Sequence, residues 1–104
     1  MDVLVTANNH CVDRGHKGIE RTIQILDTLG LQHTGTFSDS AARSKQYPLV
    51  MEKNGFRLSL LNYTYGTNGI AVPKPSVVNL IDTLQIKLDL QKAKTQQSDA
   101  IIVF

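Results

Sequence analysis

A change in the spacing of apolar residues near the start of the chain constrains the fold more than any other feature. Residues 2–7 contain Val3-Leu4-Val5, a short, largely β-branched run that predicts a strand buried on both faces. The polar residues 8–15 end in glycine and predict a loop. From Lys17 onward apolar residues recur at helical spacing, at Ile19, Ile23, Leu26 and Leu29. Gly30 follows at the position expected for the C-cap of this helix. A strand, a loop and a helix in this order predict the start of a βαβ unit.

Short strand and helix patterns alternate through the rest of the chain. Asn54-Gly55 between two apolar runs is the strongest hairpin signal, because a type I′ turn needs positive φ at both central positions. Asp82 resembles a helix N-cap with Gln85 as its capping-box partner. The expected segments are a strand at 31–37, a helical turn at 39–42, hairpin strands at 48–53 and 56–61, a brief strand at 77–81, a helix after Asp82 and a second buried strand at 99–104. This order predicts an α/β fold with a mixed sheet.

Composition places the chain among globular proteins with a single core. Of 104 residues, 41% are hydrophobic and 19% are charged, which argues against a disordered chain. The net charge of +2 is too small to indicate nucleic-acid binding, and the scattered basic residues, Arg43 among them, are expected on a solvated surface. Cys11 is the one cysteine and cannot form an internal disulfide. No apolar run is long enough to cross a membrane.

Asn8-Asn9-His10 is the segment with the clearest chemical potential, because it follows a predicted buried strand and precedes a helix. Ligand-binding loops of α/β enzymes occupy this position. His10 can bind a metal or transfer a proton near neutral pH, and an asparagine amide oxygen can ligate a divalent cation. Asp13 adds a carboxylate. On spacing alone an ordinary turn is the better explanation, since asparagine, aspartate and glycine are common turn residues.

Other candidate residues carry weaker signals. His16 is expected to be a surface histidine at the helix start, and His33 a histidine at a strand edge. Cys11 follows a histidine, but without an evident third group a packed thiol is the better interpretation. Tyr63 and Tyr65 lie two residues apart in an extended segment, so they should share one face and either line a pocket or pack against the core.

The nine residues Ala7-Asn8-Asn9-His10-Cys11-Val12-Asp13-Arg14-Gly15 resemble the capsule-biosynthesis (CapA, poly-gamma-glutamate synthesis) family, whose members show Ala-Asn-Asn-His-x-x-Asp-x-Gly after a hydrophobic strand. The similarity continues through residues 18–30, 33–35 and 48–64, and it spans essentially the whole chain. This family is related to calcineurin-like metallophosphatases. The resemblance therefore implies a partial mixed sheet flanked by helices, part of a four-layer metallophosphatase-like α/β sandwich.

Metallophosphatases of this kind hold two divalent metal ions, and the resemblance implies roles for two residues. Asn9 would be a metal ligand, and His10 would protonate the leaving group or stabilise the transition state beside the phosphate. The sequence departs from the phosphatase pattern at Asn8, which replaces a glycine, and at Cys11, which replaces an acid. Asp13 is a candidate substitute for that acid. The implied cofactors are manganese, iron or zinc ions in the intact parent protein.

The resemblance also implies that residues 1–104 form a single partial domain. The family's early aspartate motif would precede Met1 and its later histidine motif would follow Phe104, so we expect this chain alone to be inactive and to bind metal weakly or not at all. Its partner would be the rest of the parent domain, and open strand edges would favour a homodimer or a swapped oligomer. The resemblance places the parent at the bacterial cell envelope, with any membrane contact made by other segments.

Two functions follow from the resemblance. The first is that of a metal-dependent phosphoesterase-like protein acting in capsule or poly-gamma-glutamate biosynthesis. The second is that of a non-catalytic polymer-binding or assembly module of the capsule machinery on the same fold, since a fold does not determine a function. A generic α/β binding domain is the interpretation that remains if the resemblance is accidental.

Overall fold

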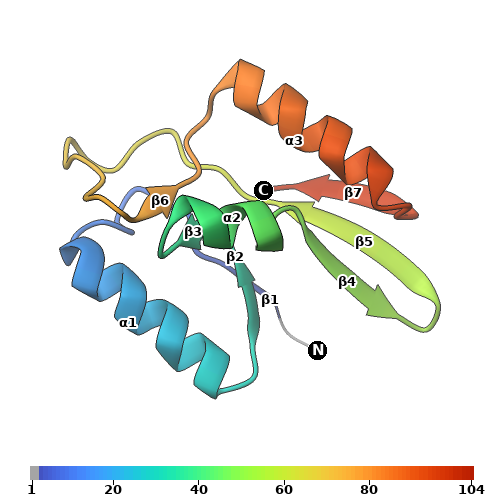
Figure 1. Ribbon diagram of the computed structural model, residues 1–104, viewed down its shortest axis with the longest axis horizontal. Helices are drawn as coiled ribbons and strands as arrows, with labels where there is room; N and C mark the ends of the chain where they lie inside the picture. The colour runs from blue at the N-terminus through green and yellow to red at the C-terminus, as the bar shows by residue number, and fades with distance from the viewer. Residues whose placement is uncertain (1–2) are drawn as a thin grey trace.

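The computed structural model describes residues 3–104, so Asp2, the first residue of the expected strand segment, lies outside the described residues. Within this range the chain forms three helices and seven short strands (Figure 1). In chain order they are β1 (Val3–Val5), α1 (Gly15–Thr28), β2 (Gln32–Thr34), β3 (Thr36–Phe37), α2 (Ser40–Gln46), β4 (Leu49–Lys53), β5 (Phe56–Leu61), β6 (Val77–Val78), α3 (Thr83–Thr95) and β7 (Ala100–Val103).

The α/β fold is confirmed, but the strands of residues 3–104 form three small sheets rather than one. β1 and β2 are parallel, β3 and β6 are antiparallel, and β5 lies between antiparallel β4 and parallel β7. The strand expected after the first helix is divided at Gly35, whose φ of +119° interrupts the extended backbone. Thr34 therefore pairs with Val5, whereas Thr36 pairs with Val78 of another sheet.

The predicted Asn-Gly hairpin is confirmed. Lys53 pairs with Phe56 across the turn, and φ is +55° at Asn54 and +78° at Gly55, as a type I′ turn requires. The brief strand expected at 77–81 is also present, but it ends after two residues as β6. The hairpin extends away from the rest of the molecule, with β7 alongside β5 (Figure 1).

The first helix ends as its sequence predicts. α1 begins two residues before the expected start, and Gly30 adopts a φ of +70° just beyond its last turn. The Leu31 amide donates to the Leu26 carbonyl at 3.0 Å, and the Gly30 amide donates to the Asp27 carbonyl at 3.1 Å. This pair of hydrogen bonds is the Schellman motif, which satisfies carbonyls that the helix end leaves free. No helix among residues 3–104 is long and apolar enough to span a bilayer.

Aspartates cap the other two helices. The Asp39 carboxylate accepts from the Ala42 amide at 2.8 Å, and the helical turn expected here extends to the seven residues of α2. Asp82 accepts from two backbone amides of α3, at 2.9 and 3.2 Å. The expected capping box is wrong in its second half, because the Gln85 side chain donates to Asp89 at 3.1 Å rather than back to the cap.

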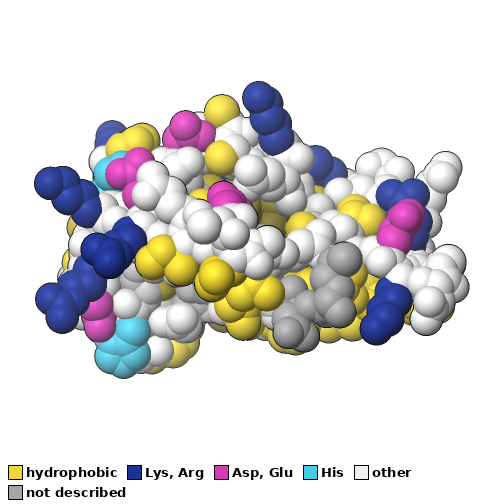
Figure 2. Space-filling model, turned by 90° about the horizontal axis from the view of Figure 1, so that it is seen from below, with side chains coloured by type: hydrophobic (Ala, Val, Ile, Leu, Met, Phe, Trp, Pro, Cys, Tyr) yellow, Lys and Arg dark blue, Asp and Glu magenta, His cyan; other side chains and the backbone are white. Residues whose placement is uncertain are grey.

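The two strands expected to be fully buried are edge strands instead. Within the described residues β1 pairs with β2 alone and β7 with β5 alone, and Leu4, Val5, Ile102 and Val103 are all exposed. Apolar composition shows that a strand is hydrophobic, but it does not reveal how many neighbours cover it. Apolar side chains gather along the middle and lower part of one face of the molecule, with charged side chains at both ends and along its upper part (Figure 2).

Two clusters of buried side chains hold the elements together. One lies between α2, α3 and β5, with its aromatic rings in edge-to-face contact; its buried members are Phe37, Tyr47, Leu61, Tyr63 and Ala93. The other lies under the polar loop that follows β1, and its buried members are Ala7, Val12, Ile19 and Val78. Because Ala7 and Val12 belong to the stretch that runs from β1 to α1, the second cluster fixes both sides of the segment that carries the predicted site residues.

Candidate functional site

The loop between β1 and α1 begins near Ala7, whose backbone amide and carbonyl both contact the side chain of Asn62. The Ala7 amide donates to Asn62 Oδ1 at 2.7 Å, and Asn62 Nδ2 lies 3.4 Å from the Ala7 carbonyl. Asn62 thus pairs with the backbone of Ala7 as a neighbouring strand would, although it belongs to the segment after β5. Both residues are buried, so these hydrogen bonds are shielded from water.

Successive turns shape the loop itself. The Asn8 side-chain oxygen accepts from the His10 amide at 2.9 Å, and the Asn8 carbonyl accepts from the Cys11 amide at 3.2 Å. This is an Asx turn, in which a short side chain replaces a backbone partner. The Asp13 amide then donates to the His10 carbonyl at 3.1 Å, and Gly15 starts α1 with a φ of +66°. The turn explanation offered by spacing is therefore correct for Asn8, whose polar atoms are used within the loop.

His10 points out of the loop and is oriented by one carboxylate. Its side chain is 68% exposed, and Nδ1 lies 2.8 Å from Asp13 Oδ2 and 3.3 Å from Asn68 Nδ2. The same nitrogen cannot donate to Asp13 and accept from Asn68. The shorter, charge-assisted contact with Asp13 determines the tautomer, so Nδ1 carries the hydrogen. No hydrogen bond of Nε2 occurs within residues 3–104, which leaves that nitrogen for a ligand.

Asn9 is oriented by a residue distant in the sequence. Its Nδ2 donates to Asn68 Oδ1 at 3.3 Å, and its Oδ1 makes no hydrogen bond within the described residues. The structure thus brings Asn9 and His10, the two predicted site residues, together with Asp13 and Asn68. Sequence analysis missed Asn68, although Asn68-Gly69 is a second Asn-Gly dipeptide and so a visible turn signal.

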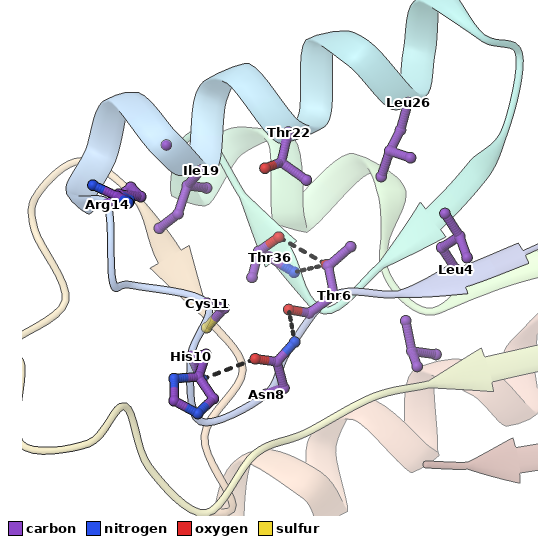
Figure 3. Close-up of a pocket in the computed structure, with 12 residues that line it drawn as sticks. Leu4, Thr6, Asn8, His10, Cys11, Arg14, Ile19, Thr22, Leu26 and Thr36 are labelled. Carbon is purple, nitrogen blue, oxygen red and sulfur yellow. Dashed lines mark hydrogen bonds between the residues drawn. The ribbon is translucent and has the colours of Figure 1, made fainter.

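A groove of about 470 Å³ runs beside this loop, between α1 and β1 (Figure 3). Its polar end is lined by Asn8, His10 and Arg14, and its remaining length largely by apolar side chains of the two elements, including Leu4, Ile19 and Leu26. The loop therefore presents its histidine at the end of a concave surface rather than on a flat one. Concave surfaces with a few polar groups are the usual setting for ligand binding.

The other histidines and Cys11 lie outside this arrangement or contribute packing. His16 Nδ1 is hydrogen-bonded to the Ser76 hydroxyl and Nε2 lies 3.1 Å from Glu20, so this histidine ties α1 to the segment before β6. The expectation of a strand-edge histidine fits His33 only partly: its side chain is 8% exposed and pairs with an aspartate of α1 at 2.8 Å. Cys11 packs against the cluster under the loop, as expected for a packed thiol.

Tyr63 and Tyr65 do not share a face, contrary to expectation. Tyr63 is buried in the aromatic cluster, whereas Tyr65 is 77% exposed. β5, the strand that would place them on one side, ends at Leu61, and beyond it Thr64 makes an isolated bridge with Leu80. Side chains two residues apart lie on the same face only while the chain remains a β-strand.

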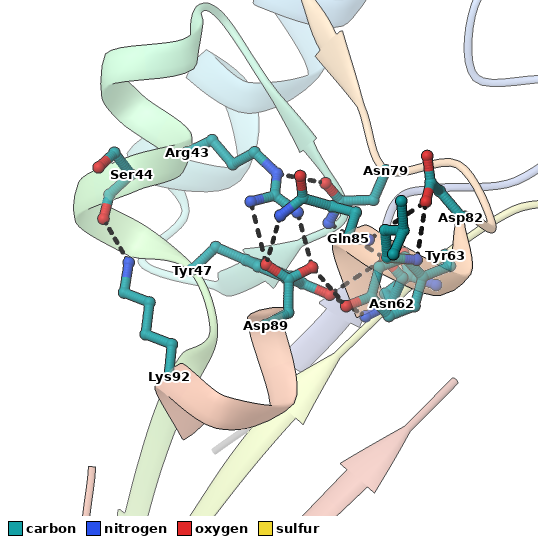
Figure 4. Close-up of polar contacts among 11 residues, drawn as sticks. Arg43, Ser44, Tyr47, Asn62, Tyr63, Asn79, Asp82, Gln85, Asp89 and Lys92 are labelled. Atoms are coloured by element: carbon teal, nitrogen blue, oxygen red, sulfur yellow. Dashed lines mark hydrogen bonds and ion pairs between the residues drawn. The ribbon is translucent and has the colours of Figure 1, made fainter. Parts of the chain in front are cut away.

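A largely buried ion pair that the sequence does not predict lies between α2 and α3 (Figure 4). Arg43 donates to both carboxylate oxygens of Asp89, at 2.9 and 3.3 Å, and the Tyr63 hydroxyl donates to the same carboxylate at 2.6 Å. Burial and the hydrogen bond to Asp89 raise the pKa of Tyr63, so its hydroxyl remains a donor. Arg43 also lies 4.7 Å above the Tyr47 ring, and it is therefore not the solvated surface charge that was expected.

A chain of hydrogen bonds connects this ion pair to the loop. Arg43 Nε donates to Asn79 Oδ1 at 2.7 Å, and Asn79 Nδ2 donates to the Asn62 carbonyl at 3.2 Å. Asn62 in turn holds Ala7, the residue before Asn8. The position of the loop therefore depends on side chains from α2, from the end of β5 and from the segment after β6.

The donor set fits part of a metal site. Asn9 offers one amide oxygen and His10 one ring nitrogen, while Asp13 is engaged with the histidine. Within residues 3–104 no three histidine, cysteine, aspartate or glutamate side chains are grouped to hold a metal ion. A protein site for a divalent transition metal usually supplies three or more ligands.

Comparison with known proteins gives one family. A comparison with curated proteins found no significant match. Residues 1–104, the whole sequence, match the family described as bacterial capsule synthesis protein PGA_cap. This match covers the loop, the helix that follows it and the Asn62 and Asn68 segments together. The chain therefore belongs to the PGA_cap family of bacterial capsule synthesis proteins and has a role in capsule synthesis.

Proposed function

We propose that the loop carrying Asn9 and His10 is one part of a metal-dependent phosphoesterase site that acts in bacterial capsule biosynthesis at the cell envelope. The observation that carries this proposal is the pairing of His10 Nδ1 with Asp13 Oδ2 at 2.8 Å, which directs Nε2 away from the loop. A carboxylate that fixes the ring and tautomer of a histidine is a common arrangement in acid–base and metal sites. The exposed histidine at the end of a groove supports the same role.

In this proposal Asn9 serves metal binding and His10 serves proton transfer. Divalent manganese, iron or zinc ions, when bound, would activate water and stabilise the phosphoryl oxygens. Asn9 would contribute its amide oxygen to their coordination. His10 in its protonated form would give the Nε2 proton to the leaving-group oxygen as the phosphorus–oxygen bond breaks, and the neutral ring would keep its Nδ1 hydrogen on Asp13. The remaining ligands would come from other parts of the parent protein.

Replacing His10 with alanine in the intact protein is expected to reduce phosphoester turnover about a hundredfold, because the leaving oxygen then departs without a proton. The loss should depend on the leaving group. Phenyl phosphate needs the proton and should show the full loss, whereas p-nitrophenyl phosphate has a stable leaving anion and should lose much less. Initial rates with manganese present would measure both. His16→Gln is the matched control, since His16 is hydrogen-bonded elsewhere.

An equal loss on both substrates would argue against a proton-donating role and favour a binding role for His10. Turnover of both substrates that the substitution leaves unchanged would reject the role of His10. No turnover of either substrate by the unchanged protein would reject the phosphoesterase proposal. The non-catalytic polymer-binding or assembly module would then be the better account of the fold, and binding of capsule polymer by the His10→Ala protein would be measured in its place.

A further inference from the structure

A second Asn-Gly turn lies against the candidate site. In residues 67–70 the Ile70 amide donates to the Thr67 carbonyl at 3.1 Å, and φ is +55° at Asn68 and +78° at Gly69. These values define a type I′ turn. Thr67 is buried and its hydroxyl donates to the Ile70 carbonyl, so the turn is closed by two hydrogen bonds and anchored on one side.

The side chain at the tip of this turn contacts both predicted site residues. Asn68 Oδ1 accepts from Asn9 Nδ2 at 3.3 Å, and Asn68 Nδ2 lies 3.3 Å from His10 Nδ1. The contacts join positions 59 and 58 residues apart in the sequence. Because His10 Nδ1 carries its hydrogen toward Asp13, the contact with Asn9 is the hydrogen bond of the two, and the Asn68 amide nitrogen only lies beside the imidazole expected to transfer a proton.

Local backbone geometry alone does not account for this placement. Asparagine tolerates positive φ better than most residues, which explains why Asn68 occupies the turn. Asn54 has the same φ, +55°, and also precedes a glycine, but its side chain makes no hydrogen bond within the described residues. The two turns share a backbone conformation, and only Asn68 directs its amide at other side chains.

We propose that Asn68 is a positioning residue of the site. By accepting the hydrogen of Asn9 Nδ2, it fixes which way the Asn9 amide faces, and so presents Asn9 Oδ1 to the metal. Groups that orient metal ligands by hydrogen bonds strengthen metal binding, and their removal weakens it about 10–100-fold. This inference rests on the proposed function, because it assigns Asn68 to the metal-binding step of the same site.

The test compares the two asparagine turns. Asn68→Gly keeps the type I′ turn, since glycine adopts positive φ without strain, but removes the amide. Asn54→Gly makes the same change in the hairpin between β4 and β5 and serves as the matched control. In the intact protein, Asn68→Gly should weaken manganese binding about tenfold by calorimetry, and Asn54→Gly should leave it unchanged. Asn68→Asp keeps the accepting oxygen and should restore binding.

A second readout does not need metal. In protein labelled with ¹⁵N, the side-chain amide signals of Asn9 should shift and exchange faster in Asn68→Gly, remain in place in Asn54→Gly, and return toward the original in Asn68→Asp. If the unchanged protein binds no manganese but these shifts are seen, the proposed metal site fails and the positioning by Asn68 stands. If Asn68→Gly and Asn54→Gly behave alike in both measurements, the inference is wrong.

Discussion

Replacing Asp89 with alanine is expected to lower the free energy of unfolding by about 3–5 kcal/mol, because the substitution leaves a guanidinium buried without its counter-charge. The Asp89 side chain is 5% exposed and that of Arg43 is 19% exposed, so water cannot replace most of what is lost. The Tyr63 hydroxyl and the Gln85 side-chain amide, which donate to the Asp89 carboxylate at 2.6 and 3.1 Å, also lose their acceptor. A buried donor without a partner adds to the cost of the lost ion pair.

Urea unfolding followed by circular dichroism would measure the effect. Glu52→Ala is the matched control: it removes a carboxylate 3.0 Å from Arg57, but the two side chains are 62% and 40% exposed, so the expected change is about 0–1 kcal/mol. If the two substitutions lower stability equally, the ion pair at Asp89 contributes no more than a surface pair, and the low exposure of its side chains does not strengthen it.

A double substitution separates the pair from its surroundings. Arg43→Met with Asp89→Leu removes both charges and fills the space with apolar atoms, and it should cost less than Asp89→Ala alone, because no unpaired charge remains. Comparing this double substitution with Arg43→Met alone and Asp89→Leu alone completes a double-mutant cycle. A coupling free energy near zero in this cycle would mean that the two residues act independently. The cycle matters for the site as well, since Arg43 also holds Asn79 and, through it, Asn62.

The features that the sequence predicts well are those set by neighbouring residues. The hairpin at Asn54-Gly55, the end of α1 at Gly30 and the N-cap at Asp82 all follow from local backbone chemistry, and the structure confirms each one. The loop of Asn9 and His10 was located in the same way, from the strand before it and the helix after it. For that loop, spacing alone favours an ordinary turn, and the resemblance along the chain is what predicts a site.

The features that the sequence does not predict depend on residues distant from one another. Arg43 and Asp89 are 46 residues apart, and each alone has the pattern of a surface charge. Asn68 reaches Asn9 across 59 residues. The burial of β1 and β7 was overestimated for the same reason, because an apolar strand looks alike at the centre and at the edge of a sheet. Local sequence patterns predict individual helices, strands and turns. Contacts between distant residues depend on how those helices, strands and turns pack against one another.

Replacing Gly35 with alanine is expected to destabilise the fold by about 3–5 kcal/mol, through strain and overlap acting together. Its φ of +119° is a conformation that residues with a Cβ rarely adopt. A Cβ built at this position would lie 2.1 Å from Asn62 Oδ1 and 2.6 Å from the Ala7 amide nitrogen. Both atoms belong to the hydrogen bond that starts the site loop, so the overlap cannot be relieved by moving a flexible side chain outward.

Gly30→Ala is the matched control for this substitution. Gly30 also has a positive φ, +70°, but a Cβ there would meet nothing within 4 Å, so only the backbone strain of about 1–2 kcal/mol applies. Urea unfolding would compare the two stabilities, and hydrogen exchange of the Ala7 amide would report on the loop. Gly35→Ala should expose that amide because Asn62 is displaced from it, whereas Gly30→Ala should leave it protected. Equal stability of the two variants with Ala7 still protected would show that Gly35 is not needed for the close approach, and that the loop is held by the buried Ala7 and Val12 side chains instead.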